Sequence, residues 1–288
     1  MADTPHFEPQ RASATSASGS AVADAGAQPV VLFENVTVSF AGPPVLQDIS
    51  FQVGPNETRI LIGPAGVGKS VLLKVVNGLI RPDSGSVFLF GEDITRMDEK
   101  QLLKLRIRTG MVFQESALFD SLNVRDNVGY QLMERHVAVD EVDRRVHEAL
   151  RFVELDHTYE MFPPSLSGGM RRRVAIARAI IDQPALLLYD SPTGGLDPVT
   201  SSTINELIIK ERDVYGTPSL LVTHRLQDAF TMATHRYDTS RGQMVPLPQG
   251  QPNPLTNFLV LHQSRLIFDG STEDLVTSKD PFIQEFIA

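Results

Sequence analysis

The segment at residues 58–70 reads TRILIGPAGVGKS, and it decides the fold of this 288-residue chain. Its first five residues predict a short buried strand that leads straight into a glycine-rich loop. The residues after the loop carry apolar side chains with helical spacing, up to a helix end at Asn77-Gly78. Strand, glycine loop and helix in this order are the context that a phosphate-binding loop needs, so the segment predicts a P-loop nucleotide-binding fold.

The glycines of this loop allow successive backbone N–H groups to point at phosphate oxygens, and the following helix adds its positive end. Lys69 is expected to reach the β- and γ-phosphates, and the Ser70 hydroxyl is expected to ligate magnesium. A purely structural glycine turn is the alternative interpretation. The candidate nucleotide-binding residues are Gly63, Pro64, Ala65, Gly66, Val67, Gly68, Lys69 and Ser70.

A second segment, LLLYDSPT at residues 186–193, supplies the other half of a nucleotide site. Its four apolar residues predict a buried strand, and Asp190 at the end of this strand is expected to hold magnesium through water. A carboxylate in that place is otherwise uncommon, because a lone buried charge is costly. Together the two segments predict a chain that binds ATP or GTP with Mg²⁺, with Ser70 and Asp190 at the metal.

The rest of the pattern predicts an α/β fold. Val30–Phe40 and Val45–Val53 are rich in Val, Phe and Ile and flank a Gly-Pro-Pro turn, so they predict an antiparallel pair. Strand character returns at residues 186–189, 219–222 and 258–261, whereas the stretch from about 97 to 182 is mostly helical. Strands interleaved with helices imply a mostly parallel sheet that is covered on both faces. We therefore expect a P-loop (RecA-like) core with an antiparallel β subdomain and an inserted α-helical subdomain.

Two segments differ in composition from this domain. Residues 1–29 are rich in Ala and Ser and poor in large apolar residues, so they predict a disordered tail before an ordered domain at 30–288. Residues 239–257 contain four prolines and predict an extended surface loop. A disordered insert and a docking site for a partner or a second copy are both open interpretations of this loop.

Composition narrows the class of protein. The chain has 26 Lys and Arg against 35 Asp and Glu, a net charge of −9, which argues against a nucleic-acid partner. It contains no cysteine, which excludes disulfides and thiolate metal sites and suits a reducing compartment. Neither a run of about 18 apolar residues nor a signal-peptide core is present. We expect a soluble, cytoplasmic protein that can dock on a membrane protein.

Five further motifs, in the order in which they occur, resemble those of ATP-binding-cassette (ABC) ATPases, the motor subunits of membrane transporters. The resemblance covers nearly everything from Val30 onward and supports ATP with Mg²⁺ as the ligand. The motifs are Phe40 as an adenine-stacking aromatic, Gln114 of the Q-loop, Leu166-Ser167-Gly168-Gly169-Met170 as the signature, Gly195-Leu196-Asp197-Pro198 as the D-loop, and Thr223-His224 as the switch.

The resemblance implies roles for these residues. Two copies close head to tail around two ATP molecules, and Ser167, Gly168 and Gly169 of one copy bind the γ-phosphate held by the other. Gln114 is implied to sense the γ-phosphate at the metal and to relay its state to the membrane partner, and His224 to position the attacking water. For Phe40, an ordinary core position is the alternative.

Arg171-Arg172-Arg173 follow the signature motif directly. They predict a solvated helix face, with a transporter or partner contact as the alternative.

Ser191 departs from the family pattern. The residue after the magnesium aspartate is a glutamate in the family, where it orients or deprotonates the attacking water. Serine is no general base near neutral pH, and loss of such help removes roughly 10²–10⁴ in rate. The candidate catalytic residues are therefore Ser191, His224 and Gln114, with slow hydrolysis expected. A nucleotide-binding regulatory or assembly subunit with little turnover, and a serine introduced by design, are the alternatives.

Three segments resemble the ATPases of MCE-type lipid transporters. They are Met170 in the signature, FQESALFDSLNV at residues 113–124, and DPFIQEF at residues 280–286. The resemblance implies a membrane permease docked near the Q-loop, a periplasmic MCE protein, a phospholipid or other hydrophobic cargo, and a place on the inner face of the bacterial inner membrane. A polar amino-acid importer is the alternative. Soluble cassette proteins of translation or DNA repair are disfavoured, since this chain has neither a second cassette nor a long coiled coil.

Overall fold

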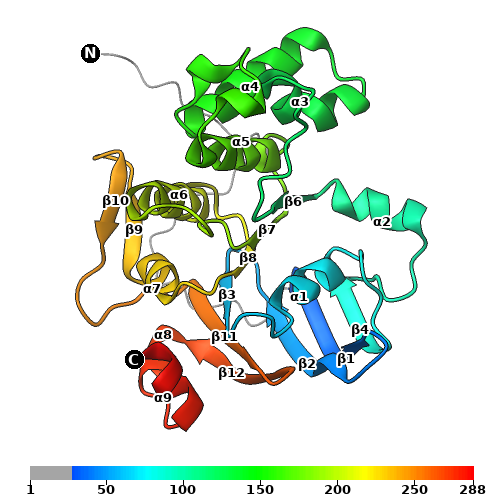
Figure 1. Ribbon diagram of the computed structural model, residues 1–288, viewed down its shortest axis with the longest axis vertical. Helices are drawn as coiled ribbons and strands as arrows, with labels where there is room; N and C mark the ends of the chain where they lie inside the picture. The colour runs from blue at the N-terminus through cyan, green and yellow to red at the C-terminus, as the bar shows by residue number, and fades with distance from the viewer. Residues whose placement is uncertain (1–27) are drawn as a thin grey trace.

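A six-stranded sheet forms the centre of the computed structural model, which describes residues 28–288 (Figure 1). The predicted tail at residues 1–29 thus lies almost wholly outside the described residues. Five strands of the sheet are parallel, and β12 joins its edge antiparallel to β11. In spatial order the strands are β12 (Arg265–Ser271), β11 (Thr256–His262), β3 (Thr58–Ile62), β8 (Ser219–Val222), β7 (Leu186–Asp190) and β6 (Thr109–Val112).

Both faces of this sheet are buried, and successive residues of a strand enter different cores. In β3, Ile60 and Ile62 pack into the core formed with α3 to α7, whereas Leu61 packs into the core beneath the antiparallel sheet. In β7, Tyr189 belongs to the first core and Leu188 to the second. A strand buried on both faces reads as an unbroken apolar run, which is why these segments were detectable in the sequence.

The second sheet is antiparallel and has the order β2-β1-β4-β5. Val31 pairs with Val53 on one side and with Leu89 on the other. In Figure 1 helices α1 and α2 lie beside this sheet. The expected α/β class, with a parallel core and an antiparallel subdomain, is confirmed. The elements are β1 (Val31–Ser39), β2 (Pro44–Val53), β4 (Ser84–Leu89), β5 (Glu92–Asp93), α1 (Lys69–Val76) and α2 (Glu99–Arg106).

Helices α3, α4 and α5 form a separate group at the top of Figure 1. Helix α4 shows why they pack: Val142, Val146 and Leu150 recur every four residues and are fully buried. Ser167 caps α5, because its hydroxyl accepts a hydrogen bond from the Met170 N–H at 3.2 Å. The elements are α3 (Val124–Glu134), α4 (Val139–Phe152), α5 (Gly168–Ile180) and two short 3₁₀ turns at Asp156–Thr158 and Pro163–Ser165.

The predicted helical limits of 97–182 need correction at β6. This strand lies inside that stretch but pairs with β7, with Thr109 opposite Leu186, so it belongs to the central sheet. The inserted helices therefore begin after Val112. Gly110 explains the weak strand signal: a Cβ there would lie 2.4 Å from the Ala179 carbonyl oxygen, so close contact with α5 demands glycine.

The proline-rich stretch at 239–257 also differs from its prediction. Residues Gln243–Pro246 form β10, which pairs antiparallel with β9 (His235–Asp238). The interpretation as a loop throughout is therefore wrong for this part. Pro246 is tolerated because it ends an edge strand, where its missing donor is not needed. The remaining elements are α6 (Pro198–Lys210), a π-helical turn at Glu211–Tyr215, α7 (Leu226–Thr234), α8 (Thr272–Val276) and α9 (Pro281–Ile287).

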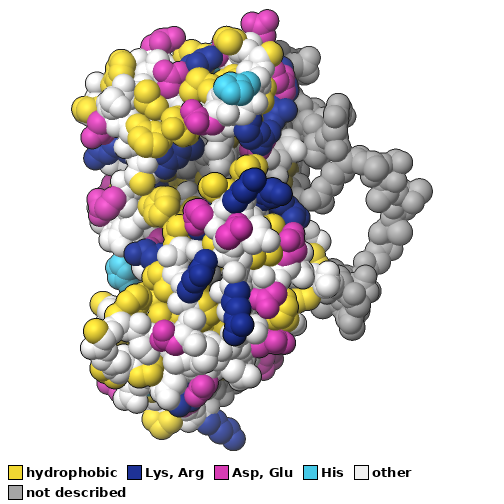
Figure 2. All heavy atoms as spheres, turned by 90° about the vertical axis from the view of Figure 1, so that its right-hand side faces the viewer, with side chains coloured by type: hydrophobic (Ala, Val, Ile, Leu, Met, Phe, Trp, Pro, Cys, Tyr) yellow, Lys and Arg dark blue, Asp and Glu magenta, His cyan; other side chains and the backbone are white. Residues whose placement is uncertain are grey.

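The surface is mixed in character. On the face that Figure 2 shows, acidic and basic side chains are interspersed, with hydrophobic side chains among them. The net charge of −9 is therefore not gathered into one acidic patch on this face. Among residues 28–288, helices that are long and apolar enough to cross a membrane are absent.

Candidate nucleotide-binding site

The glycine loop joins the end of β3 to the start of α1, as the sequence predicts. Gly63 has a φ of +152°, and a Cβ there would come within 2.2 Å of the Leu261 carbonyl oxygen. Gly68 has a φ of +109°, and a Cβ there would lie 2.9 Å from Val45 at the start of β2. Glycine is thus required at both ends of the loop, where the backbone is pressed against two neighbouring strands.

Lys69 folds back over the loop that precedes it. Its Nζ donates to the Gly63 carbonyl at 2.8 Å and to the Pro64 carbonyl at 2.7 Å. The side chain is 8% exposed, and burial lowers the pKa of its ammonium group, while the Asp190 carboxylate opposes that shift. The two acceptors are neutral carbonyls, so the lysine is held in place without a direct ion pair and remains available to an anion.

The two halves of the site meet at Ser70 and Asp190. The Ser70 hydroxyl donates to Asp190 Oδ1 at 3.0 Å, which places the first turn of α1 beside the end of β7. A hydroxyl and a carboxylate are oxygen donors of the kind that Mg²⁺ prefers. They lie next to a helix N-terminus whose free N–H groups attract phosphate. This arrangement fits a magnesium–nucleotide complex.

Gln114, Ser191 and His224 lie at one edge of the sheet because three parallel strands end there. Val112 of β6 is opposite Tyr189, and Asp190 of β7 is opposite Val222 of β8. Each predicted catalytic residue follows one of these strand ends within two residues. The Gln114 Cγ lies 3.6 Å from the position of a Cβ on Gly194, so this side chain lies beside the turn that Ser191 begins. His224 and Gln114 are exposed.

Ser191 has an unusual backbone and a buried side chain. Its φ is +48°, in the left-handed region, and the residue is 6% exposed. The Ser191 N–H donates to the Val222 carbonyl at 2.8 Å, and the Gly194 N–H donates to the Ser191 carbonyl at 2.9 Å. Non-glycine residues in this region cluster at functional sites, where the surrounding structure holds them.

Arg172 corrects the prediction that residues 171–173 form a solvated face. It is 4% exposed and points into the site, whereas its neighbours in the triplet are partly exposed. Its guanidinium donates to the carbonyls of Ser191 at 3.0 Å and Pro192 at 2.8 Å, and it also contacts the Gln114 carbonyl. Charge alone misled the sequence interpretation, because nothing local in the triplet indicates which arginine faces inward.

A second network beside the site was not predicted at all. Asp228, in the first turn of α7, is 4% exposed and accepts hydrogen bonds from Thr193 Oγ1 and from Asn205 Nδ2, the latter at 2.9 Å. Arg225 Nε lies 3.3 Å from the same carboxylate. Arg225 also donates to the Thr193 carbonyl at 3.1 Å and to Ser201 Oγ at 2.6 Å. The network connects Arg225, which follows His224, to Thr193, which lies between Asp190 and the D-loop.

Phe40, Ser167 and Gly168 are exposed, and Gly169 is half-buried. Phe40 follows β1 in the turn before β2 and is 54% exposed, which rules out the core alternative. Ser167 and Gly168 lie at the exposed start of α5. Within residues 28–288, Ser167 has no hydrogen bond to the glycine loop; its hydroxyl caps its own helix.

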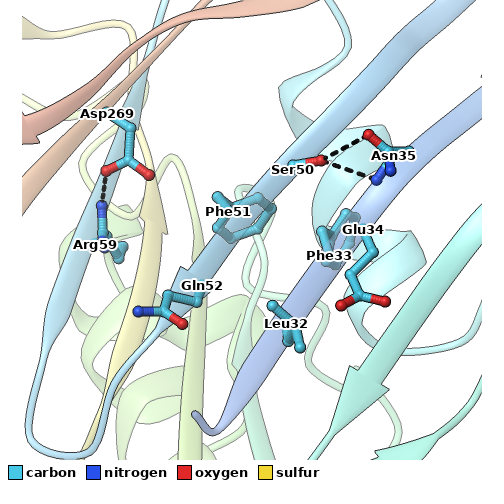
Figure 3. Close-up of a pocket in the computed structure, with 9 residues that line it drawn as sticks. All are labelled: Leu32, Phe33, Glu34, Asn35, Ser50, Phe51, Gln52, Arg59 and Asp269. Carbon is cyan, nitrogen blue, oxygen red and sulfur yellow. Dashed lines mark hydrogen bonds and ion pairs between the residues drawn. The ribbon is translucent and has the colours of Figure 1, made fainter. Parts of the chain in front are cut away.

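A surface hollow of about 670 Å³ lies apart from these residues (Figure 3). Arg59 pairs with Asp269 on one side of it, and the Ser50 hydroxyl donates to Asn35 on the other. Arg59 stands near the start of β3, whereas the glycine loop leaves the opposite end of this strand. The hollow contains none of the predicted site residues. Its lining is Leu32, Phe33, Glu34, Asn35, Ser50, Phe51, Gln52, Arg59 and Asp269.

A family profile described as "ABC transporter" matches residues 46–194, just over half of the chain. The chain belongs to the ABC transporter family. Cassettes of this family are ATPases that bind ATP with Mg²⁺, so the match agrees with the geometry of the glycine loop and Asp190.

Curated relatives of this ABC ATPase have several names. Protein TRIGALACTOSYLDIACYLGLYCEROL 3, chloroplastic, of Arabidopsis thaliana is 34% identical over 88% of this chain and 71% of its own length. Probable ribonucleotide transport ATP-binding protein mkl of Mycobacterium tuberculosis is 34% identical over 88% of this chain and 64% of its own. Methionine import ATP-binding protein MetN of Rhizobium etli is 41% identical over 70% of this chain and 56% of its own. The chain thus spans between 56% and 71% of the length of these relatives.

Solved structures of ABC cassettes have the same fold. A dimeric post-hydrolysis state of the cassette MJ0796, bound to ADP and Pi, superposes with a TM-score of 0.71 at 26% identity and covers 84% of this chain and 98% of its own. The cassette cbiO1 of Clostridium perfringens, part of the transporter complex cbiONQ, superposes with a TM-score of 0.73 at 26% identity and covers 87% of this chain and 92% of its own.

Proposed function

We propose that this chain is the ATP-hydrolysing subunit of an ABC transporter that moves phospholipid or another hydrophobic cargo, with slow intrinsic turnover. The observation that carries the proposal is the hydrogen bond between Ser70 and Asp190 at the edge of the sheet where Gln114 and His224 also lie. In this proposal residues 30–288 form the ATPase domain. The relative named for a galactolipid, trigalactosyldiacylglycerol, supports a lipid cargo.

The glycine loop, from Gly63 to Gly68, holds the phosphates in this proposal, with Lys69 at the β- and γ-phosphates. Ser70, Asp190 and Gln114 would hold Mg²⁺, which would neutralise charge at the transferring phosphoryl group. In this proposal Phe40 stacks on the base; its exposure in the turn before β2, and the contact of Gly68 with the start of that strand, support this role.

Hydrolysis in this proposal depends on His224 and on a water held at Ser191. The Ser191 hydroxyl can accept or donate a hydrogen bond, but it cannot take a proton near neutral pH as glutamate can. We therefore expect a turnover roughly 10²–10⁴ below that of an otherwise equal site with glutamate. The intact hydrogen bonds around Ser191 support a formed site and not a decayed one.

The second nucleotide-binding surface belongs to a second copy of the chain in this proposal. Ser167, Gly168 and Gly169 offer free N–H groups at the positive end of α5, which suits the γ-phosphate. The exposure of Ser167 and Gly168, and the dimeric state of the MJ0796 cassette, support a head-to-tail dimer in which these residues serve the partner's ATP.

The remaining partners are a membrane permease, which docks near Gln114, and a periplasmic MCE-type protein; nucleic acid is not among them. The ATPase then lies in the cytoplasm, on the inner face of the inner membrane. Two alternatives have specific support. The methionine-import relatives favour a polar amino-acid importer. Ser191 favours a regulatory or assembly subunit that binds ATP and hardly hydrolyses it.

Turnover tests the proposal. Magnesium-dependent ATPase activity is measured for the chain with its permease partners, for Ser191→Glu and for a Lys69→Ala control. Activity of the native chain well above the control supports the motor. If Ser191→Glu alone turns over while the native chain binds ATP and dimerises, the chain is a regulatory subunit.

Cargo is tested separately in proteoliposomes. Stimulation of the ATPase by phospholipid, with no response to methionine, supports the lipid assignment. The reverse response assigns the chain to an amino-acid importer and leaves the ATPase assignment intact.

A further inference from the structure

Arg172 contacts two loops of the candidate site at once. From α5 its guanidinium donates to the Ser191 carbonyl at 3.0 Å and the Pro192 carbonyl at 2.8 Å. Its remaining N–H groups donate to Ser116 Oγ at 3.3 Å and to the Gln114 carbonyl. Four acceptors from two segments, 75 positions apart or more along the chain, thus converge on one side chain.

The four acceptors carry no charge, and Arg172 forms no ion pair within residues 28–288. A buried cation without a carboxylate partner is costly, and the four hydrogen bonds that its three nitrogens donate offset part of that cost. Burial lowers the pKa of Arg172, and the negative charges of Glu115 and Asp190 oppose this shift. An apolar side chain in this place would leave the four acceptors without this donor, so the arginine is explained by the two loops that it joins.

Two neighbouring arginines show how specific this placement is. Arg178, also on α5, donates to the carbonyls of Ser116 at 2.9 Å and Ala117 at 2.7 Å and so contacts the first segment. Arg225 donates to the carbonyl of Thr193 at 3.1 Å and so contacts the second. Arg172 contacts both, and it joins them to each other.

We infer that Arg172 is a positioning residue that fixes the Gln114 loop and the Ser191 loop to each other and to α5, the helix that Ser167 caps. The inference rests on the proposed function. In the head-to-tail dimer, Ser167 contacts the ATP of the partner subunit, while Gln114 and Ser191 serve the chain's own ATP. A shift of α5 caused by one nucleotide therefore moves the water-positioning loop of the other site.

Arginine suits this role because its planar fork presents five donors in a fixed geometry. Lysine in its place keeps the charge but makes a point contact, so it restores part of the link. Glutamine keeps two donors and loses the charge. Arg173 is the matched control: it lies one position along α5, it is also an arginine, and it donates to the Val153 carbonyl at 3.2 Å, away from both loops.

The first test needs no nucleotide. The chain lacks cysteine, so Glu115→Cys provides a single site for a spin label beside Gln114. In this background R172Q is expected to increase the label's mobility, R172K to increase it less, and R173Q to leave it unchanged. An unchanged spectrum in R172Q overturns the inference, whatever the chain does with ATP.

The second test separates positioning from binding. R172Q is expected to lower kcat by about 10–100-fold, the effect of a misplacement near 1 Å, and to leave the KM for MgATP within about threefold. R172K is expected to recover part of kcat, and R173Q to match the native chain. An equal loss of kcat and MgATP affinity in R172Q, or no recovery in R172K, overturns the inference in favour of a merely structural role.

Failure of the proposed function has a different signature. A native chain that binds MgATP no better than Lys69→Ala contradicts the nucleotide site, while the nucleotide-free label still reports on Arg172. If R172Q does not fold, both tests are done with R172K. This variant keeps the charge and length of the side chain but lacks the planar guanidinium group.

Discussion

The Ser70 hydroxyl and the Asp190 carboxylate share a hydrogen bond of 3.0 Å, although 120 positions of sequence separate them. The bond places the first turn of α1 against the end of β7. The oxygen atoms around the proposed magnesium are therefore held by the protein itself, and binding of the ion needs little rearrangement of these two residues.

Asp190→Asn tests this arrangement. The amide oxygen can still accept from Ser70, so the fold is retained while the negative charge is lost. We expect the gain in nucleotide affinity on adding Mg²⁺ to fall by about 10–100-fold, the range seen when residues around a metal are changed. Titration of Mg²⁺ at a fixed concentration of a fluorescent ATP analogue measures this gain. Ser70→Thr, which keeps a hydroxyl, is the control expected to behave as the native chain.

Lys69→Met is expected to abolish phosphate binding without destabilising the chain. Burial lowers the pKa of Lys69, so the charged form is disfavoured in the folded state without ligand. The unfolded chain then binds more protons than the folded one as pH approaches the ordinary lysine pKa, and stability from this group rises with pH. Urea unfolding at neutral and alkaline pH measures this effect. The free energy of unfolding should rise less with pH for Lys69→Met than for Lys74→Met, an exposed control on the same helix.

The adjacent signature glycines should respond differently to alanine. A Cβ on Gly169 would come within 2.3 Å of Thr200 Cγ2, and Thr200 is held by hydrogen bonds to Asp197. A Cβ on Gly168 would meet Leu196 at 3.7 Å, an ordinary contact. Gly169→Ala is therefore expected to lower the melting temperature, and Gly168→Ala to preserve it.

ATP-dependent dimerisation then separates folding from function at these glycines. We expect Gly168→Ala to fold and yet dimerise poorly, because the proposed head-to-tail dimer brings the partner's phosphate to this exposed position. Adding Thr200→Ser to Gly169→Ala should restore the melting temperature. A Gly169→Ala chain as stable as the native one contradicts the crowding argument.

Glu211 gives the chain a pH dependence of its own. Burial raises the pKa of this carboxyl to about 7, while the Thr217 hydroxyl, which donates to it at 2.9 Å, and Lys210 oppose the shift. The folded state then binds more protons than the unfolded state from about pH 4.5 to 7, so the free energy of unfolding from this group falls as pH rises through that window. Urea unfolding of Glu211→Gln should lack this fall, which amounts to about 3 kcal/mol. A native chain with the same pH profile as Glu211→Gln argues against the buried, protonated carboxyl.

Asp228→Ala is expected to destabilise the fold by about 3 kcal/mol. It leaves Asn205, Thr193 and Arg225 without the buried carboxylate that accepts their hydrogen bonds and charge. Chemical denaturation measures the loss, and Gln227→Ala, an exposed neighbour on α7, is the control. A loss below about 1 kcal/mol would show that Arg225 finds solvent or another partner.

The sequence predicted the parts of the fold whose signals are local. A buried strand, a glycine loop and a helix follow one another directly, so the site from Gly63 to Ser70 needed no knowledge of tertiary contacts. Asp190 was detectable for the same reason, as an acid at the end of an apolar run. The antiparallel pair was also detectable from short runs of Val, Ile and Phe, and the parallel core from short runs rich in Leu.

The parts that escaped prediction depend on distant residues. Strand β6 is four residues long and includes Gly110, whose place is explained only by the carbonyl of Ala179 in α5. The burial of Arg172 follows from carbonyls on two remote loops, and the cluster around Asp228 joins three separate elements. Strand β10 was hidden by prolines, because local rules cannot tell an edge strand from a loop.

The two arginines beside the nucleotide site hold the segment at residues 191–193 by its carbonyl oxygens: Arg172 takes those of Ser191 and Pro192, and Arg225 takes that of Thr193. Backbone atoms are the same in every amino acid. These contacts are therefore open to any residue at position 191, whereas its φ of +48° and its burial limit which side chains fit there. In the proposed function, a change of this one residue alters the rate of ATP hydrolysis while both arginines keep their contacts with the loop.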